Sequence, residues 1–303
     1  MIKRVAKLAG SIVFFFVDSL AGILRNPDRS KRYPRCVILY YHGVRKEEKE
    51  RFARQMDTVL RWTVPVSLRD GFAGQAGRCY TAVTFDDGFI SVIRNALPLL
   101  RERKIPAMMF VTAGCLGKKL PWSDLDGGKI DRIMTCDELK SFASDPSELI
   151  TIGSHCITHA SLLSLDDEHA RREIAESRQE LEKITGQIVR HLSYPAGEYE
   201  EREVCFAREA GYLATFSIEP KLAFENRDEF VIGRVKVDPS DWQIEFILKI
   251  WGYYRWLCWA YRIKKRLRSL TGLRDYVYIL LRIELLRDNL PWLAPLLTER
   301  ILD

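Results

Sequence analysis

The chain of 303 residues contains no Cys-x-x-Cys pair, no internal repeat and no low-complexity tract. Its seven cysteines are scattered and odd in number, so the sequence indicates neither a structural zinc knuckle nor a disulfide framework. The hydrophobic and charged fractions, 47% and 29%, are those of a globular protein that can build a large core. Because barrels of roughly 200–250 residues commonly form one domain, we expect one large domain with extensions at its ends.

The middle of the chain lacks a positive net charge, although the net formal charge of the whole chain is +6. Residues 1–35 carry eight basic and two acidic side chains, and residues 245–303 carry eleven and six, which leaves −5 for residues 36–244. A nucleic-acid binder usually has its positive charge on the working domain, whereas basic ends rich in apolar residues suit an anionic membrane surface. We therefore expect no nucleic acid as partner. We expect instead contact with a membrane surface through the ends, and a place in the cell envelope, associated with the inner membrane on a side that the sequence leaves open.

The first segment, residues 3–24, combines a mainly apolar helical pattern with polar residues at every seventh position. Arg4, Ser11, Asp18 and Arg25 fall on one line of a helical wheel, so a narrow polar stripe runs along the predicted helix. Its uninterrupted apolar run is shorter than the roughly 20 residues that cross a bilayer. Three interpretations stay open: an amphipathic helix at a membrane interface, a cleaved signal peptide, or a helix packed on the protein's own core.

Between residues 36 and 242, short apolar and β-branched runs alternate with helical patterns. Such alternation implies a largely parallel sheet, open or closed into a barrel, with working residues at the carboxyl ends of the strands. The predicted strands are 36–41, 63–67, 80–85, 107–112, 150–153, 189–194, 214–217 and 230–237, and the predicted helices are 47–61, 91–103, 135–142, 166–185 and 200–210.

After residue 242 the pattern is helical only. Six aromatic residues lie within positions 251–261, directly before the basic run 262–266. This composition fits either a helix that caps the barrel or an aromatic and basic surface at a membrane interface. We therefore divide the chain into an N-terminal amphipathic helix with a basic linker, 1–35, a central domain, 36–242, and a helical extension, 243–303.

Two adjacent carboxylates follow the predicted strand 80–85, in the run Thr84-Phe85-Asp86-Asp87-Gly88. Taken alone, Asp-Asp-Gly is a good turn sequence. Adjacent side chains in an extended or turning backbone point in different directions, so one carboxylate can bind a metal while its neighbour faces a water molecule.

Two of the five histidines, His155 and His159, lie four positions apart after the predicted strand 150–153. Across a helical or tight turn, two such imidazoles can meet one metal ion. Together with Asp87 they would form a two-histidine, one-carboxylate site with open positions, and Asp86 would be the neighbouring base. Such a metal polarises a carbonyl and lowers the pKa of water toward about 7, which suits amide or ester hydrolysis.

These residues resemble the motifs of a known family. The segments 84–88, 155–159, 193–197 and 238–242 are similar to the four motifs of the polysaccharide deacetylases, the NodB-homology group or carbohydrate esterase family four, over about residues 36–242. The resemblance implies an α/β fold, a distorted (β/α)7 barrel with a divalent metal, most often zinc. It also implies hydrolytic removal of N-acetyl groups from amino sugars.

The resemblance also implies roles for individual residues. Asp87, His155 and His159 correspond to the metal ligands and Asp86 to the base. The backbone N–H of Ala196 would stabilise the oxyanion, and the aromatic ring of Trp242 would line the acetyl pocket. Tyr194, Pro195, Ala196, Gly197 and Trp242 are thus the expected substrate-binding residues, with Trp122, Tyr194 and Tyr199 as candidate sugar-stacking platforms or packing residues.

Two departures from the family pattern concern the residues around the base and the acid. Ser193 stands where many members carry an arginine that orients the base, so Arg234, on the strand before Asp238, is the candidate substitute. The alternative for Arg234 is a surface or barrel-end ion pair. Arg234 and Asp238 are the residues that we expect to support the site without being ligands or bases. Because no histidine follows His191, the late general acid of the family is missing.

A histidine near the start of the chain can take the acid role instead. Residues 39–44 resemble the opening of exopolysaccharide-type deacetylases, whose motifs are permuted, and this implies that His42 protonates the leaving amine. A structural histidine is the alternative, as we expect for His169 and His191. In the fourth motif, Ser240 with Gln243 predicts a capping box for the next helix, of which Trp242 would be the first buried aromatic.

The sequence thus predicts metal-dependent hydrolysis of N-acetyl groups from the amino sugars of a bacterial polysaccharide or its lipid-linked precursor. One alternative is a deformylase or deacetylase of a sugar attached to polyprenyl phosphate. The other is a catalytically silent carbohydrate-binding barrel, against which the intact set of acidic and histidine residues argues.

Overall fold

The computed structural model describes residues 2–25, 35–72, 74–119, 132–144, 147, 149–225 and 229–259. The chain divides into two compact units, residues 1–256 and 257–303. The boundary expected at residues 242 and 243 therefore falls inside the first unit. Trp122 and the basic run 262–266 lie outside the described residues.

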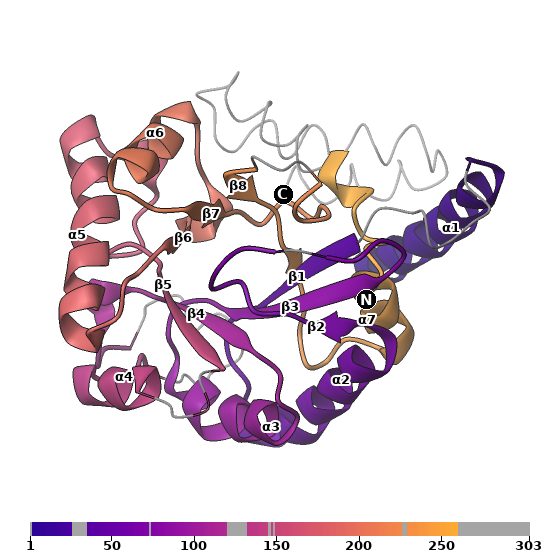
Figure 1. Cartoon of the computed structure of the whole chain (residues 1–303), viewed down its shortest axis with the longest axis horizontal. Coiled ribbons are helices and arrows are strands. Elements are labelled where there is room, and N and C mark those ends of the chain that lie inside the picture. The colour runs from indigo at the N-terminus through magenta and orange to yellow at the C-terminus, as the bar shows by residue number, and fades with distance from the viewer. Residues whose placement is uncertain are drawn as a thin grey trace, which may run out of the picture. The chain divides into compact units, whose positions relative to one another are not determined.

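A parallel sheet forms the centre of the first unit (Figure 1), in the order β8-β7-β6-β5-β4-β3-β1-β9. Every pairing between neighbours in this order is parallel, as the βα alternation predicts. The strands are β1 (Arg35–Tyr41), β3 (Cys79–Phe85), β4 (Ala107–Val111), β5 (Ile150–Ser154), β6 (His191–Ser193), β7 (Ala214–Phe216), β8 (Val231–Ile232) and β9 (Val235–Lys236). A two-residue strand, β2 (Val64–Pro65), also pairs with β3.

The sheet curls because one short stretch of chain joins its two edges. β8 pairs with β7 at one edge, β9 pairs with β1 at the other, and only Gly233 and Arg234 separate them. The single strand predicted over 230–237 is therefore broken, because its first half pairs with β7 and its second half with β1. Counted as one broken strand beside the six longer ones, it completes the distorted (β/α)7 barrel that the sequence predicts.

Helices cover the outer face of the sheet (Figure 1). They are α2 (Lys49–Trp62), α3 (Leu97–Glu102), α4 (Cys136–Ala143), α5 (Asp167–Thr185) and α6 (Glu201–Glu209), with single 3₁₀ turns at Lys46–Glu48, Ala113–Cys115, Leu162–Ser164 and Pro195–Gly197. The predicted helix 91–103 begins instead with a π-helical turn, Val92–Ala96. α5 begins where the Asp166 side chain accepts the N–H of His169 and ends at Gly186, whose φ of 69° suits a glycine.

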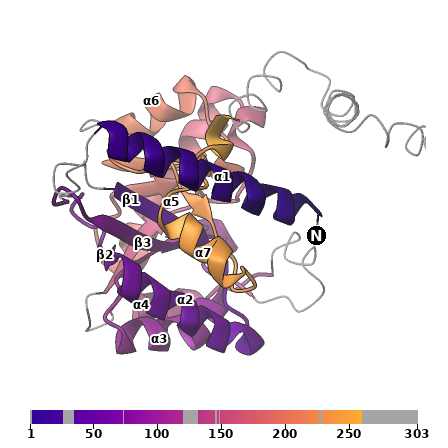
Figure 2. The ribbon, with the colours of Figure 1, turned by 90° about the vertical axis from the view of Figure 1, so that its right-hand side faces the viewer.

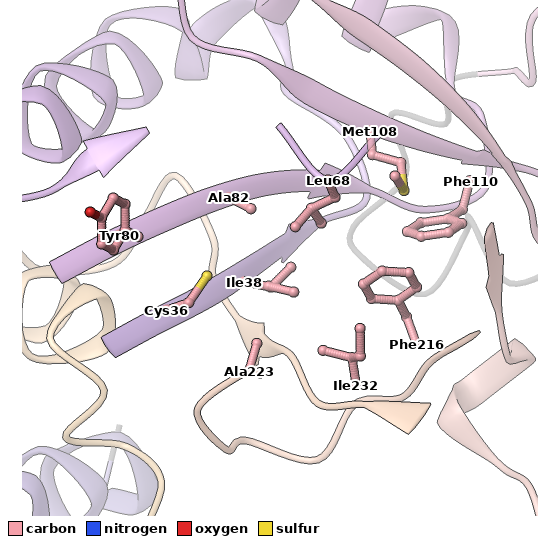
Figure 3. Packing of buried hydrophobic residues seen from close by; sticks show 10 residues of the cluster. All are labelled: Cys36, Ile38, Leu68, Tyr80, Ala82, Met108, Phe110, Phe216, Ala223 and Ile232. Atoms are coloured by element: carbon pink, nitrogen blue, oxygen red, sulfur yellow. The ribbon is translucent and has the colours of Figure 1, made fainter. Parts of the chain in front are cut away.

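Inward-facing side chains alternate along the strands, as expected for a barrel. Figure 3 shows Cys36 and Ile38 of β1 and Met108 and Phe110 of β4 packed together inside it. The other members of this buried cluster are Leu68, Tyr80, Ala82, Phe216, Ala223 and Ile232. Since the same alternation continues toward the carboxyl ends, positions 40, 84 and 86 face the same interior.

Two helices from opposite ends of the described chain lie side by side, α1 (Ile2–Arg25) and α7 (Gln243–Ile250) (Figure 2). The polar stripe of α1 faces the rest of the first unit, residues 35–256, which we call the barrel unit. Trp256 Nε1 donates to Ser11 Oγ at 2.9 Å, and Asp18 binds Arg35 at 3.0 Å. Tyr253 and Tyr254 are buried beneath α1, which fits the capping interpretation for this part of the extension. No helix among the described residues is long and apolar enough to span a membrane.

The joint between β8 and β9 has room for glycine only. A Cβ at residue 233 would lie 2.3 Å from the backbone oxygen of Glu219, so Gly233→Ala should lower the free energy of unfolding by about 3 kcal/mol. Gly186→Ala is the control, because open space surrounds it and only its positive φ costs energy, about 1 kcal/mol. Urea unfolding measures both; equal losses would contradict the tight joint.

Candidate active site

The carboxyl ends of the parallel strands bring together residues that are far apart in the sequence. His42 follows β1, Asp86 and Asp87 follow β3, His155 follows β5, and Ser193 ends β6. The pairing of Tyr40 with Thr84 puts His42 and Asp86 on adjacent strands at the same level. The predicted gathering of these residues at one mouth of the barrel is therefore present.

The three predicted metal ligands form one cluster. Their ligand atoms all lie within 4.8 Å of one another, with Asp87 Oδ1 3.8 Å from His155 Nε2 and 3.7 Å from His159 Nε2. Asp87 has a φ of 71°, which an aspartate adopts more readily than most residues, and Gly88 follows with 88°. The Asp-Asp-Gly turn and the candidate metal site are thus the same structure.

The two histidines are brought together by a tight turn rather than by a helix. Cys156 and His159 have φ values of 63° and 62°, and the imidazole centroids are 4.8 Å apart. His155 Nδ1 lies 2.7 Å from the backbone oxygen of Ser193. If Nδ1 carries the proton and donates it to this oxygen, Nε2 keeps its lone pair for a metal, the usual arrangement of a ligating histidine.

The cluster fits a divalent cation. Asp87 Oδ1 is buried and accepts no hydrogen bond from the described residues, although a buried carboxylate oxygen normally has a partner. Burial, with the neighbouring Asp86 as the second cause, raises the pKa of Asp87 to about 8, and burial lowers the pKa of His155 to about 3. A neutral imidazole with a free nitrogen and a carboxylate without a counter-ion are the donors that a metal satisfies.

The neighbouring carboxylate, Asp86, has its counter-ion in the protein. Arg234 has no exposed surface, and its Nη1 and Nη2 donate to the two carboxylate oxygens of Asp86 at 2.7 and 2.8 Å. Burial is the largest single influence and raises the pKa of Asp86, but Arg234 together with His155 and His42 outweighs it, and the pKa lies below its usual value. The predicted contact between Arg234 and Asp86 is therefore present, in a buried position and not at the surface.

Ser193 explains how an arginine from another strand reaches the base. Its hydroxyl accepts from Arg234 Nη2 at 2.7 Å, and its small side chain leaves the barrel interior open to the long guanidinium. Arg234 arrives from the joint between β8 and β9, so the broken strand and the ion pair depend on each other.

His42 lies at the same mouth, exposed to solvent, with its ring 5.9 Å from that of Tyr40 in an edge-on arrangement. Its charge helps to lower the pKa of Asp86 and the pKa of His159. Burial is the largest influence on both groups, but it raises the pKa of Asp86 and lowers that of His159. An exposed imidazole next to the candidate base and a candidate ligand can exchange protons with a bound substrate.

The loop after β6 is a tight turn at the carboxyl end of its strand. Ala196 is exposed and has a φ of 54°, while Pro195 and Gly197 are buried beside it. Tyr194 is fully buried and stacks on Tyr199 at 5.0 Å. The ring of Tyr194 therefore supports this loop and offers no open face to a sugar, contrary to the stacking role considered for it.

The fourth motif is arranged differently from the predicted capping box. Trp242 is the N-cap of α7 without a side-chain bond, and Gln243 Nε2 donates to Thr58. The Asp238 carboxylate accepts the N–H of Ser240 at 2.7 Å and so stabilises its own turn. The ring of Trp242 is 41% exposed and lies under the guanidinium of Arg4 from α1, so it is not a buried aromatic.

The sequence did not indicate one supporting residue, Glu173. Glu173 of α5 accepts the backbone N–H groups of Ile157 and Thr158 at 2.9 and 3.0 Å, and the Thr158 hydroxyl at 2.6 Å. These contacts fix the turn between His155 and His159. No local pattern distinguishes Glu173 from the other acidic residues of this polar helix, because only the packing of α5 on β5 brings it to the turn.

Comparisons with known proteins agree with this arrangement. Residues 73–215 match the family described as polysaccharide deacetylase. YxkH of Bacillus subtilis, whose name places it among the polysaccharide deacetylases, is 27% identical over 158 residues, 52% of this chain and 51% of that protein. The poly-beta-1,6-N-acetyl-D-glucosamine N-deacetylase of Staphylococcus aureus is 24% identical over 170 residues, 56% and 57% of the two chains. The chain thus spans about half the length of these curated relatives.

Solved structures share the fold. IcaB from Ammonifex degensii superposes with a TM-score of 0.60 at 24% identity, over 72% of this chain and 98% of that one. The polysaccharide deacetylase BC0361 from Bacillus cereus gives 0.58 at 20% identity, over 71% and 69%.

A curled parallel sheet with an Asp-His-His cluster at the carboxyl ends of its strands defines a barrel of the NodB-homology type. Residues 73–215, slightly less than half of the chain, match the polysaccharide deacetylase family.

The turn held by Glu173 provides a test of the cluster. In Glu173→Gln the charged acceptor of the two backbone N–H groups becomes a neutral amide and these hydrogen bonds weaken, so we expect zinc affinity to fall about tenfold, measured by competition with a chromophoric chelator. Glu176→Gln, on the same helix but paired with Arg172 at the surface, is the matched control. Unchanged zinc affinity in Glu173→Gln would show that the turn does not need this carboxylate.

Proposed function

We propose that the chain hydrolyses N-acetyl groups on the amino sugars of a bacterial polysaccharide, with a divalent metal held by Asp87, His155 and His159. The observation that carries the proposal is a carboxylate kept ionised by Arg234 directly beside an intact two-histidine, one-carboxylate cluster. Zinc is the first candidate, because three nitrogen and oxygen ligands with an open position are typical of its catalytic sites.

The protein's own groups divide the chemistry among them. A bound metal would polarise the acetamide carbonyl and lower the pKa of water. Asp86, ionised and oriented by Arg234, accepts the proton of the water that attacks the carbonyl carbon. The backbone N–H of Ala196, in the loop after β6, donates a hydrogen bond to the developing oxyanion. His42 supplies the proton that the sugar nitrogen needs when the carbon–nitrogen bond breaks and acetate leaves.

A polysaccharide is the first candidate substrate because His42 and Ala196, after the carboxyl ends of β1 and β6, are exposed to a large substrate. A sugar attached to polyprenyl phosphate, as substrate of a deacetylase or deformylase, is the second candidate, favoured by the outward apolar face of α1 described below. Activity on a lipid-linked amino sugar with none on soluble oligomers would select the second. A silent carbohydrate-binding barrel is disfavoured, because binding alone needs no buried Arg–Asp pair beside a ligand cluster.

Asp86→Asn tests the base. The amide keeps the shape of the carboxylate but cannot accept the proton, so acetate release from N-acetylglucosamine oligomers should fall by about 10²–10⁴-fold while bound zinc, measured by mass spectrometry, stays constant. Asp57→Asn, at an exposed carboxylate paired with Arg103, should release acetate normally. Full acetate release by Asp86→Asn would remove Asp86 from the mechanism.

His42→Gln tests the acid. Without the imidazole, turnover on the same oligomers should fall by about 10²-fold with unchanged zinc content, and added imidazole should restore part of the rate. His169→Gln, at an exposed histidine of α5, serves as the control. A rate that stays low with imidazole and a loss of zinc would instead make His42 a supporting residue of the metal cluster.

A further inference from the structure

α1 is docked on the barrel unit with its polar side inward. Arg4 Nε donates to Glu245 at 2.6 Å and its Nη2 to the Ser240 backbone oxygen at 2.7 Å. Further along the same line, Ser11 is fully buried and Asp18 binds Arg35 and Arg255. The polar groups of this stripe are therefore satisfied by the protein itself.

The opposite side of α1 is apolar and open. The exposed large side chains recur at three and four positions along the helix and are Ile2, Val5, Val13, Phe16, Val17 and Leu20. Phe16 is 65% exposed and Leu20 61%. Such a stripe is about 27 Å long at 1.5 Å per residue and normally faces a core. A contiguous apolar face of this kind marks an interaction surface.

A groove continues this face toward the barrel unit. It has a volume of about 350 Å³ and is lined by Gly10, Val13, Phe14, Val17 and Trp256. The lining is apolar apart from the Trp256 ring nitrogen, which already donates to Ser11. An aromatic ring with its polar atom turned inward, next to an apolar stripe, suits the boundary of a lipid layer.

Charge decides which occupant fits. Lys3 and Lys7 of α1 are exposed, while the single acidic residue of this helix, Asp18, is paired with arginines. Residues 260–303 carry nine basic and five acidic side chains, so this segment, with its net positive charge, is a poor complement to these lysines. A second copy would bring the same lysines. A surface of anionic lipid supplies both apolar chains and negative charge.

We propose that α1 lies flat on an anionic lipid surface through its outward apolar face, while its polar stripe stays bound to the barrel unit. The helix need not detach from the protein to bind, because the two functions use opposite sides of it. Arg4 donates to the backbone oxygen of Ser240, in the turn that follows β9. This turn comes directly after the carboxyl end of that strand. Lipid binding therefore holds the barrel mouth at a fixed orientation to the membrane.

The test uses the full chain and flotation with vesicles of phosphatidylcholine alone or mixed with phosphatidylglycerol. The unmodified protein should float with the mixed vesicles and much less with phosphatidylcholine. The double variant Phe16→Ser, Leu20→Ser should bind the mixed vesicles at least about tenfold more weakly. Lys3→Gln with Lys7→Gln should weaken binding by about fivefold per lysine.

The matched control is Ile188→Ser with Leu213→Ser, because these side chains are 61% and 62% exposed but lie away from α1. This variant should bind like the unmodified protein, and all variants should keep its melting temperature. The proposal is overturned if the full chain fails to float, if the α1 variant floats equally well, or if phosphatidylcholine alone suffices. A dimer in size-exclusion chromatography that the α1 variant abolishes would assign the face to a second copy instead.

Discussion

The buried pair of Arg234 and Asp86 is the interaction on which the site depends. The guanidinium has five N–H donors, and its five contacts reach both oxygens of Asp86, the hydroxyls of Thr84 and Ser193, and the Ser217 carbonyl. Loss of one partner would leave a buried charge uncompensated, a cost of about 3–5 kcal/mol. The barrel can hold an ionised base in its interior because it also provides this complete set of acceptors.

The same pair links the candidate base to the closure of the sheet. Arg234 stands where β8 leaves β7 and β9 joins β1, and the cramped position of Gly233 beside it fixes the path of the chain. A strand that changes partners is a weak point in a sheet, because two residues make no ladder hydrogen bonds. Here the arginine side chain compensates by crossing the barrel interior to the end of β3.

Two adjacent carboxylates have opposite environments. Asp86 faces a guanidinium, whereas Asp87 turns away through a positive φ and faces two neutral imidazoles. One therefore stays ionised without a metal, and the other gains a counter-charge only from a cation. This difference suits the two neighbouring residues to the proposed roles of base and ligand.

The sequence by itself determined the βα alternation, the parallel sheet, and the positions of Asp86, Asp87, His155 and His159 after strands, because hydrophobic periodicity and short motifs are local signals. It also indicated the polar stripe of α1. Only the tertiary structure decided that this stripe faces inward and leaves an apolar face outside. The reason is that its partners, Glu245, Arg35 and Arg255, come from distant parts of the chain. For Arg234 the sequence left open a contact with Asp86 or a surface or barrel-end ion pair, and the structure decided for Asp86, 148 positions away. Likewise, only the structure shows that Glu173 reaches the histidine turn across packed layers. Such contacts follow from how strands and helices meet in space, and no local pattern records them.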